Sequence, residues 1–259
     1  MRLRSAPGSR LVYRYYERRL RCDLERGGVV PRHIAMIIDG NRRWAREQRL
    51  ASVGHGHRAG AAKLREFVDW CDEIGVEIVT LYLLSRDNLS GRASAELEEL
   101  CEIIAELADH LSRQGGRRIR HVGDVRGLPA PLVEALEGAV ERSCDNGGLT
   151  VNLAVGYGGR HEVTEAVRRI LGAAGEATPA ELAERLTPEL IAEHLSTAGQ
   201  PDPDLVIRTS GEQRLSDFML WQSAHSEFYF VEALGPDLRE VDFLRAVRAY
   251  GLRERRYGR

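Results

Sequence analysis

Several features that are common in proteins are absent or scarce in this chain of 259 residues. Its four cysteines never form a C-x-x-C pair, so the sequence indicates neither a zinc site nor a disulfide framework. Its longest nearly apolar run, Ile78–Leu84, is far shorter than the ~20 residues that cross a bilayer. No charged-then-apolar segment typical of a signal peptide opens the sequence. We therefore expect a cytoplasmic globular protein.

An excess of basic charge is also missing. The chain has 37 Lys and Arg against 39 Asp and Glu, a formal net charge of −2. Because a nucleic-acid binder normally carries a clear basic excess, we expect no nucleic acid among the partners. Lys63 is the only lysine of the sequence, and it follows alanine. This excludes a Walker A loop, in which the lysine follows a glycine.

What the chain does have is a regular alternation of short apolar runs and helical patterns. The runs are Ile34–Ile38, Ile78–Leu84, Ile119–Val122, Leu149–Val155, Leu205–Ile207 and Phe228–Val231. Stretches with apolar residues at helical spacing separate them, such as Leu97–Leu111. This alternation predicts a mostly parallel sheet covered by helices on both faces. We expect a single α/β domain with six strands over residues 31–259.

Residues 1–30 form a basic extension in front of this domain. Eight arginines and three acidic residues lie within residues 1–26, and apolar residues recur among them at helical spacing. Two interpretations remain open: a solvated peripheral helix, or a helix that docks on an anionic membrane surface. The second would place the protein at the inner face of the membrane.

Polar clusters follow four of the predicted strands. They comprise residues 39–44, residues 85–89 with Arg92 and Glu96, residues 156–160 and residues 208–216. Ligands of an open parallel sheet bind beyond the carboxyl ends of its strands, so we expect these clusters to meet at one edge. Arginine forms paired, charge-assisted hydrogen bonds with phosphate, and glycine lets backbone N–H groups approach it. The predicted ligand is therefore a phosphate ester.

Asp39 ends the first predicted strand, within the first of these clusters. A carboxylate at a strand end among phosphate-binding groups suits a Mg²⁺ ligand better than a structural acid. The sequence thus predicts a magnesium ion beside the arginines.

Long motifs of this chain resemble the cis-prenyltransferase (undecaprenyl diphosphate synthase) family. They are similar to the family's signatures in order along the chain, from about residue 31 to residue 259. The stretches concerned are His33–Ala45, Gly56–Gly60, Leu81–Leu89, Pro203–Ser216, Phe218–Phe230 and the terminal Glu254–Gly258.

The resemblance implies that isopentenyl diphosphate condenses with an allylic diphosphate, which creates a Z double bond and releases diphosphate. It implies Mg²⁺ as cofactor, held by Asp39 and Glu227, with Asp39 essential and Asn88 at the position of proton removal. Arg256 and Gly258 would reach across a homodimer into the partner's site. The other substrate-binding positions that it implies are Gly40, Asn41, Arg42, Arg43, Trp44, His57, Ser85, Arg86, Asp87, Leu89, Arg92, Arg208, Arg214, Leu215 and Ser216.

The chain departs from the family pattern near the reaction centre. Leu89 stands where the family usually has Trp, and Asp87 where it usually has Glu. Long-chain members commonly have a small residue at the position of Leu83, whereas Leu83 and Leu84 here resemble the actinobacterial short-chain (2Z,6E)-farnesyl diphosphate synthases. A bulky side chain in the product tunnel would stop elongation early; plain core packing is the other interpretation of Leu83. Adjacent strand residues point to opposite faces, so we expect only one of the two leucines to line the tunnel.

Three functions remain open. The first is a short-chain cis-prenyltransferase with geranyl diphosphate as primer, and the second makes a long polyprenyl diphosphate for cell-wall carrier lipid. The third, a non-catalytic partner subunit, should lack the metal and arginine set that this chain carries. The all-helical trans-prenyltransferases need a D-D-x-x-D pair, which does not occur in this sequence.

Overall fold

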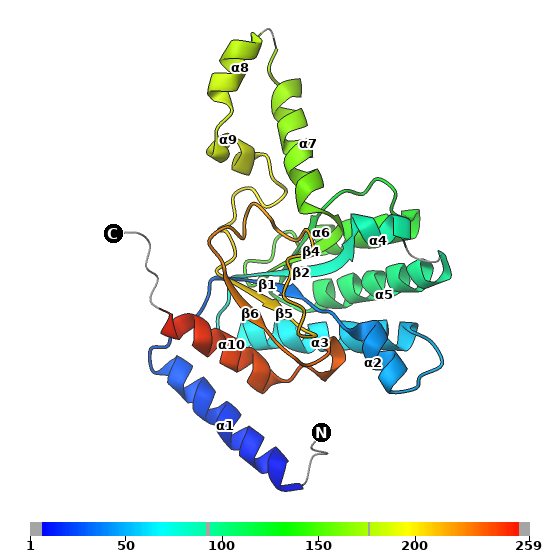
Figure 1. The fold of residues 1–259 in the computed structure, drawn as a ribbon, viewed down its shortest axis with the longest axis vertical. Coiled ribbons are helices and arrows are strands. Elements are labelled where there is room, and N and C mark those ends of the chain that lie inside the picture. Colours follow the sequence, from blue (N-terminus) through cyan, green and yellow to red (C-terminus); the bar gives the residue numbers. More distant parts are fainter. Residues whose placement is uncertain (1–6, 92–93, 176, 254–259) are drawn as a thin grey trace.

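The computed structural model describes residues 7–91, 94–175 and 177–253 (Figure 1). Six parallel strands form one sheet in the order β3-β4-β2-β1-β5-β6. The strands are β1 (His33–Ile37), β2 (Ile78–Ser85), β3 (Arg118–Val122), β4 (Thr150–Tyr157), β5 (Leu205–Arg208) and β6 (Glu227–Phe230). Each strand falls on one of the six apolar runs, which confirms the predicted α/β domain.

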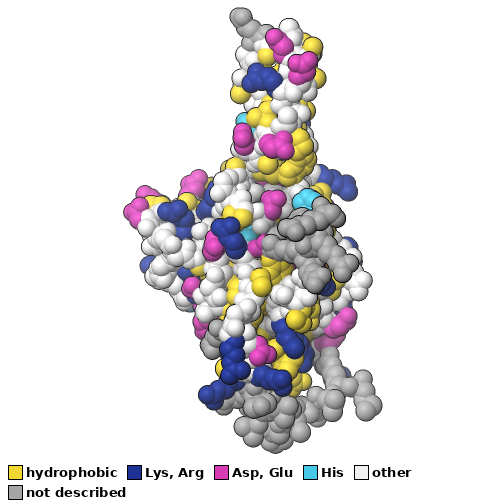
Figure 2. Space-filling view, turned by 90° about the vertical axis from the view of Figure 1, so that its left-hand side faces the viewer, with side chains coloured by type: hydrophobic (Ala, Val, Ile, Leu, Met, Phe, Trp, Pro, Cys, Tyr) yellow, Lys and Arg dark blue, Asp and Glu magenta, His cyan; other side chains and the backbone are white. Residues whose placement is uncertain are grey.

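Helices connect the strands. Those of the main body are α2 (Asn41–Glu47), α3 (Gly54–Glu73), α4 (Arg86–Gly91), α5 (Ser94–Arg113), α6 (Ala130–Ser143), the 3₁₀ helix η1 (Gly235–Asp237) and α10 (Glu240–Leu252). Helices α7 (Gly159–Gly172), α8 (Pro179–Arg185) and α9 (Pro188–Glu193) form an arm that projects from the body (Figures 1 and 2). The hydroxyls of Thr178 and Thr187 cap α8 and α9, each directly before the proline that begins its helix.

The two faces of the sheet are packed differently. On one face, α3, α5, α6 and α10 close a large apolar core that includes the fully buried Leu81 and Val151. The other face carries a smaller cluster, and its described members outside the strands are Phe218 and Met219 of the loop after β5. A loop therefore supplies this second layer, where we expected a helix.

A buried polar ladder links three strands. Nδ1 of His33 lies 2.8 Å from the Pro201 carbonyl oxygen, and its Nε2 lies 2.8 Å from Oγ1 of Thr80. The Asn152 amide donates to the same Thr80 oxygen at 2.9 Å and to Oε1 of Gln200 at 2.7 Å. Because a carbonyl only accepts, His33 must carry its proton on Nδ1 and accept the Thr80 hydroxyl at Nε2. Burial lowers the pKa of His33 to about 4, so the ring stays neutral.

This ladder predicts a loss of stability in mild acid. The folded-state pKa of His33, about 4, lies below its ordinary 6.5, so the unfolded chain binds the proton first. The contribution of His33 is complete above about pH 6.5 and is lost as the pH falls toward 4, by about 3 kcal/mol in all. Chemical unfolding followed between pH 7 and 4 should show a shallower decline for His33→Gln than for the wild type. The same substitution at the exposed His55 is the matched control; equal slopes for wild type and His33→Gln would contradict the prediction.

The basic extension contains helix α1 (Pro7–Glu25), which packs against α10. Leu20 is buried in the core of the domain, and Arg21 forms 2.6 Å ion pairs with Glu73 of α3 and Glu240 of α10. The predicted helix is thus present and docked on the domain. Within the described residues, no helix is both long and apolar enough to span a bilayer. Peripheral contact of α1 with a membrane stays a prediction.

Candidate active site

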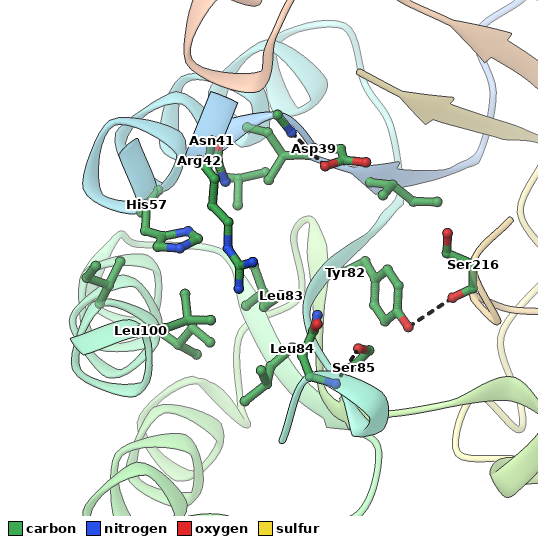
Figure 3. A pocket seen from close by; sticks show the side chains of 18 of the residues that line it. Asp39, Asn41, Arg42, His57, Tyr82, Leu83, Leu84, Ser85, Leu100 and Ser216 are labelled. Carbon is green, nitrogen blue, oxygen red and sulfur yellow. Dashed lines mark hydrogen bonds between the residues drawn. The ribbon is translucent and has the colours of Figure 1, made fainter. Parts of the chain in front are cut away.

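A cavity of about 610 Å³ opens beyond the carboxyl ends of β1, β2 and β5 (Figure 3). Its polar lining consists of Asp39, Gly40, Asn41, Arg42, Arg43, Arg46, His57, Ser85, Asp87, Asn88, Arg208, Arg214 and Ser216. Its apolar lining comes mainly from β2, α3 and α5 and includes Leu64, Leu83, Leu84, Leu100, Ile103, Ile104 and Leu107. Three of the four polar clusters therefore meet as predicted. The fourth, at residues 156–160, contributes Gly156, Gly158 and Tyr157 to a separate cavity instead.

Hydrogen bonds with Thr209, Gly235 and Gly40 hold Asp39 in place. Its N–H donates to Oγ1 of Thr209 at 2.7 Å, the Thr209 hydroxyl donates to its carbonyl at 2.9 Å, and the N–H of Gly235 donates to the same carbonyl at 2.8 Å. Its Oδ1 accepts the N–H of Gly40 at 2.6 Å. The side chain is still 38 % exposed. A preorganised carboxylate thus faces the cavity.

Arg208 lies beside Asp39 and is only 4 % exposed. Its Nη2 donates to Oδ2 of Asp39 at 2.6 Å, and its Nη1 donates to Oγ of Ser216 at 2.9 Å and to the carbonyl of Arg214. Its Nε is buried with no partner among the described atoms. A buried guanidinium with an unused N–H can donate to a further anionic oxygen.

Glycines in α3 allow the first turn of α2 to approach closely. A Cβ at Gly56 would lie 2.1 Å from the Asn41 carbonyl oxygen, and one at Gly60 would lie 2.5 Å from Oδ1 of Asn41. Any side chain at either position would push α2 away. The Oδ1 of Asn41 is buried without a hydrogen-bond partner in the described part of the chain. It packs against Gly60 and Gly235.

The carboxylates of Glu96 and Glu212 pair with further arginines at the opening of the cavity. Oε1 of Glu96 accepts Nε of Arg42 at 2.7 Å and lies 3.1 Å from Nε2 of His57. His57 is buried on α3. The carboxylate of Glu212 likewise pairs with Arg43, at 3.3 Å, and with Arg214. With Arg46, the mouth carries more positive than negative side chains, which favours a polyanion.

The loop that carries Arg214 and Ser216 has unusual backbone angles. Non-glycine residues adopt left-handed φ values, 73° at Ser210, 51° at Ser216, 62° at Asp217 and 45° at Met219. Such strain persists only where surrounding contacts impose it, and it concentrates at functional sites. Here the Tyr82 hydroxyl donates to the Ser216 carbonyl at 3.2 Å, and the Gly159 N–H donates to the Asp217 carbonyl at 2.7 Å. Burial raises the pKa of Tyr82 well above its usual range, so the phenol keeps the proton that it donates.

An irregularity in β2 changes which leucines reach the cavity. Tyr82 pairs with Ala154 and Leu84 with Val155, so Leu83 is an extra residue in β2. Leu81, Leu83 and Leu84 consequently all pack on the same core, whereas Tyr82 faces the other side. Leu83 and Leu84 both line the cavity (Figure 3). The expectation that only one of them does so is wrong, because it assumed a regular strand.

The predicted second metal ligand lies elsewhere. Glu227 begins β6, level with Leu205 at the start of β5, and therefore lies at the opposite edge of the sheet from Asp39. It forms an ion pair with Arg253. The expected pairing of Glu227 with Asp39 is not formed within one chain, because Glu227 is the first residue of its strand whereas Asp39 follows the end of one.

The donor set near Asp39 nevertheless suits magnesium. No cluster of three or more His, Cys, Asp or Glu that could hold a metal occurs in the described ranges. Mg²⁺ usually needs only one or two protein carboxylates, with water and substrate phosphates completing its shell. Asp39, whose carboxylate is 38% exposed at the cavity, meets that need.

Several predicted residues stand outside the lining. Trp44 donates from Nε1 to Asp237 at 2.9 Å, and Arg86 pairs with Asp124 at 2.9 Å. The predicted residues that do not line the cavity are Trp44, Arg86, Leu89 and Leu215. The predicted residues Arg92, Arg256 and Gly258 lie outside the described residues.

Three residues that shape the site lie outside the set predicted from the sequence. Arg46 lies one helical turn after Arg42, a spacing that could have revealed it. Thr209 fixes Asp39 through contacts that only the register of β1 with β5 creates. Tyr82 carries no signal, because it lies within an apolar run.

The cavity lies at the carboxyl edge of a parallel sheet and has an arginine-rich opening above an apolar interior. These features define a protein that binds amphiphilic phosphate esters. A family sequence model described as "Putative undecaprenyl diphosphate synthase" matches residues 37–258. The chain is 55% identical over 249 residues to a (2Z,6E)-farnesyl diphosphate synthase from Thermobifida fusca, covering 95% of this chain and 97% of the relative. It is 50% identical over 252 residues to a short-chain Z-isoprenyl diphosphate synthase from Mycobacterium bovis, covering 96% of each chain.

A solved structure supports the same relationship. Lavandulyl diphosphate synthase from Lavandula x intermedia, in complex with dimethylallyl diphosphate, superposes with a TM-score of 0.81 at 34% identity. The match covers 87% of this chain and 97% of that one. The chain therefore belongs to the undecaprenyl diphosphate synthase family, the cis-prenyltransferases.

Proposed function

We propose that this protein is a short-chain cis-prenyltransferase that joins isopentenyl diphosphate to an allylic diphosphate such as geranyl diphosphate. The product would be a Z-configured prenyl diphosphate such as (2Z,6E)-farnesyl diphosphate. The observation that carries this proposal is one cavity that combines a cationic mouth, a preorganised carboxylate and an apolar interior lined by leucines and isoleucines. The names of the relatives from Thermobifida fusca and Mycobacterium bovis support it.

The side chains of the apolar lining favour a short product over a long one. Leu83 and Leu84 of β2 and Leu100, Ile104 and Leu107 of α5 all line this part of the cavity. Bulky side chains leave less room for a growing prenyl tail than small ones would. We therefore expect elongation to stop early.

The residues fit the charge changes of the reaction. Ionisation of the allylic C–O bond leaves negative charge on the departing diphosphate, which Arg42, Arg43 and the backbone near Gly40 would stabilise. Arg208, Arg214 and Ser216 would hold isopentenyl diphosphate so that its double bond meets the allylic carbon. The proton lost in forming the new double bond would leave on the side of Asn88.

Magnesium would be held by Asp39 together with diphosphate oxygens. When bound, it would neutralise the leaving group and so lower the barrier to ionisation. Arg208 occupies Oδ2 of Asp39 here, so this carboxylate and the arginine would share the incoming diphosphate.

The decisive experiment measures incorporation of labelled isopentenyl diphosphate with dimethylallyl, geranyl and farnesyl diphosphates, with and without Mg²⁺. We expect magnesium-dependent transfer and products that end after one or two additions. A ladder of long products would establish the long-chain alternative. Absence of transfer with every primer would establish the non-catalytic alternative.

Arg208 and Arg214 should differ in weight although both line the cavity. Arg208 is buried and makes fixed contacts, whereas the side chain of Arg214 is 62% exposed and already paired with Glu212. Arg208→Ala should raise the KM for isopentenyl diphosphate about a hundredfold and also lower kcat, and Arg214→Ala should raise this KM about tenfold. Steady-state kinetics with each substrate varied in turn would check this. A rise in the KM of the allylic primer alone would show that the two diphosphate sites are exchanged.

We further propose that the protein is a homodimer in which each C-terminus contributes to the partner's active site. Arg256 and Gly258, which would contribute to the partner's site, lie outside the described residues. Sedimentation of the full chain, compared with a chain shortened by residues 255–259, would test this. Unchanged turnover of a shortened, dimeric enzyme would remove the C-terminus from the site.

A further inference from the structure

Helix α4 carries the residues of the reaction centre but is very short. It comprises six residues, and Ser85 directly before it, with Asp87 and Asn88 within it, lines the cavity. Isolated helices of this length do not hold their own shape in water, so external contacts must fix it. The Asn88 N–H donates to Oγ of Ser85 at 3.1 Å, which ties the first turn to β2.

Arg86 supplies a contact on the other side of α4. It lies between two cavity residues but does not line the cavity itself. Its Nη1 donates to Oδ2 of Asp124 at 2.9 Å. Its Cδ lies within van der Waals distance of the position that a Cβ would take at Gly158, just before α7. Arg86 therefore points away from the substrate site, toward the ends of β3 and β4.

Asp124 joins three separate elements at this point. It follows the end of β3, and its side chain is largely buried. Its carboxylate accepts from Nη1 of Arg86, from Nε2 of His161 in α7 at 2.9 Å, and from the backbone N–H of Arg126 at 2.9 Å. Hydrogen bonding by the Arg126 side chain is the largest of the causes that hold the pKa of Asp124 well below its usual range. Asp124 is thus a permanent anion within reach of α4.

The start of α7 supports the opposite wall as well. The N–H of Gly159 donates to the Asp217 carbonyl at 2.7 Å, and the N–H of Arg160 donates to Oδ1 of Asp217 at 3.1 Å. Asp217 follows Ser216, which lines the cavity. The start of α7 therefore supports two walls of the site. It contacts α4 through Asp124 and Arg86, and it contacts the loop that carries Ser216 through Asp217.

We propose that Arg86 and Asp124 are a positioning pair that locks α4, and with it Asp87 and Asn88, in the geometry needed for isoprenyl transfer. This role rests on the function proposed above and replaces the expected substrate contact of Arg86. Displacement of a catalytic group by about 1 Å can cost about a hundredfold in rate without affecting binding. The pair should consequently act on kcat and leave both KM values nearly unchanged.

Four variants test the pair: Arg86→Ala, Asp124→Asn, their combination, and Arg86→Lys. We expect Arg86→Ala and Asp124→Asn each to lower kcat roughly tenfold or more, with both KM values within about twofold of wild type. The double variant should be no worse than the poorer single one, since the two side chains act through one contact. Lysine at position 86 should restore part of kcat as a point charge. Arg126→Ala, which removes a partner of Asp124 that does not touch α4, is the control and should leave kcat unchanged.

Amide hydrogen exchange gives a readout that does not require turnover. Exchange of the α4 amides should quicken in Arg86→Ala and not in Arg126→Ala. If Asp124→Asn fails to fold, comparing kcat of Arg86→Ala with that of Arg86→Lys still tests whether the charge at position 86 positions α4. A raised diphosphate KM at unchanged kcat would make Arg86 a substrate ligand, and unchanged kcat with unchanged exchange would refute the pair. If the wild-type protein shows no transfer activity, the proposed function is overturned. The exchange data would still test whether the Arg86–Asp124 contact holds α4 in place.

Discussion

Replacing Asp39 by alanine should reduce isoprenyl transfer at least about 1,000-fold. The carboxylate is the metal ligand proposed above, and the N–H of Gly40 holds one of its oxygens in place. Loss of the metal at a developing diphosphate anion removes the largest electrostatic contribution to ionisation. Single-turnover rates at saturating Mg²⁺ would measure the effect. Activity within tenfold of wild type would remove Asp39 from the metal site.

A second substitution separates catalysis from stability. Asp39 is also the carboxylate partner of the buried Arg208, so alanine should lower the melting temperature as well. Asp39→Asn preserves an oxygen that can accept from Gly40 or Arg208, and it should melt closer to wild type while remaining as inactive as alanine. Binding of Mn²⁺ followed by electron paramagnetic resonance, in the presence of a diphosphate substrate, should be lost in both variants. Retained Mn²⁺ binding would contradict the assignment.

The fold could be predicted because the sheet is entirely parallel and buried. Strands of this kind read as continuous apolar runs, and all six runs of the sequence became strands. The order of the strands did not follow from these runs, since it depends on long-range pairing such as that of His33 with Ile78 in β1 and β2. The composition of the second layer, with Phe218 and Met219, could not be read either, because those residues belong to a loop without periodicity.

The candidate site could be predicted where a residue directly follows a strand. Asp39 and the cluster beginning at Arg208 reach the cavity for that reason. Glu227 does not reach the cavity because it is the first residue of β6 and so lies at the opposite edge of the parallel sheet. Arg86 fails for a different reason: it follows β2, but the first turn of α4 directs it toward Asp124. Position along the chain identifies the edge of the sheet, whereas the rotation of each side chain depends on its neighbours.

Product length should respond to both leucines of the irregular segment of β2. Leu84 is 1% exposed and Leu83 half-buried, and both line the apolar part of the cavity. Truncation to alanine removes three carbons, roughly 90 Å³, whereas one isoprene unit of five carbons needs roughly 150 Å³. Each single variant should therefore broaden the product distribution, and the double variant should add one whole unit.

Leu81→Ala is the matched control, because Leu81 is fully buried on the same face but does not line the cavity. Leu81→Ala and Leu84→Ala should each cost ~2–5 kcal/mol of unfolding free energy, and Leu83→Ala less. Chromatography of products from a geranyl primer, with thermal melts of each variant, would separate the two effects. Only the cavity-lining variants should lengthen the product, although all three lose packing. An unchanged product from the double variant would show that β2 does not limit the chain. The limit would then lie on α5, whose Leu100, Ile104 and Leu107 also line the cavity.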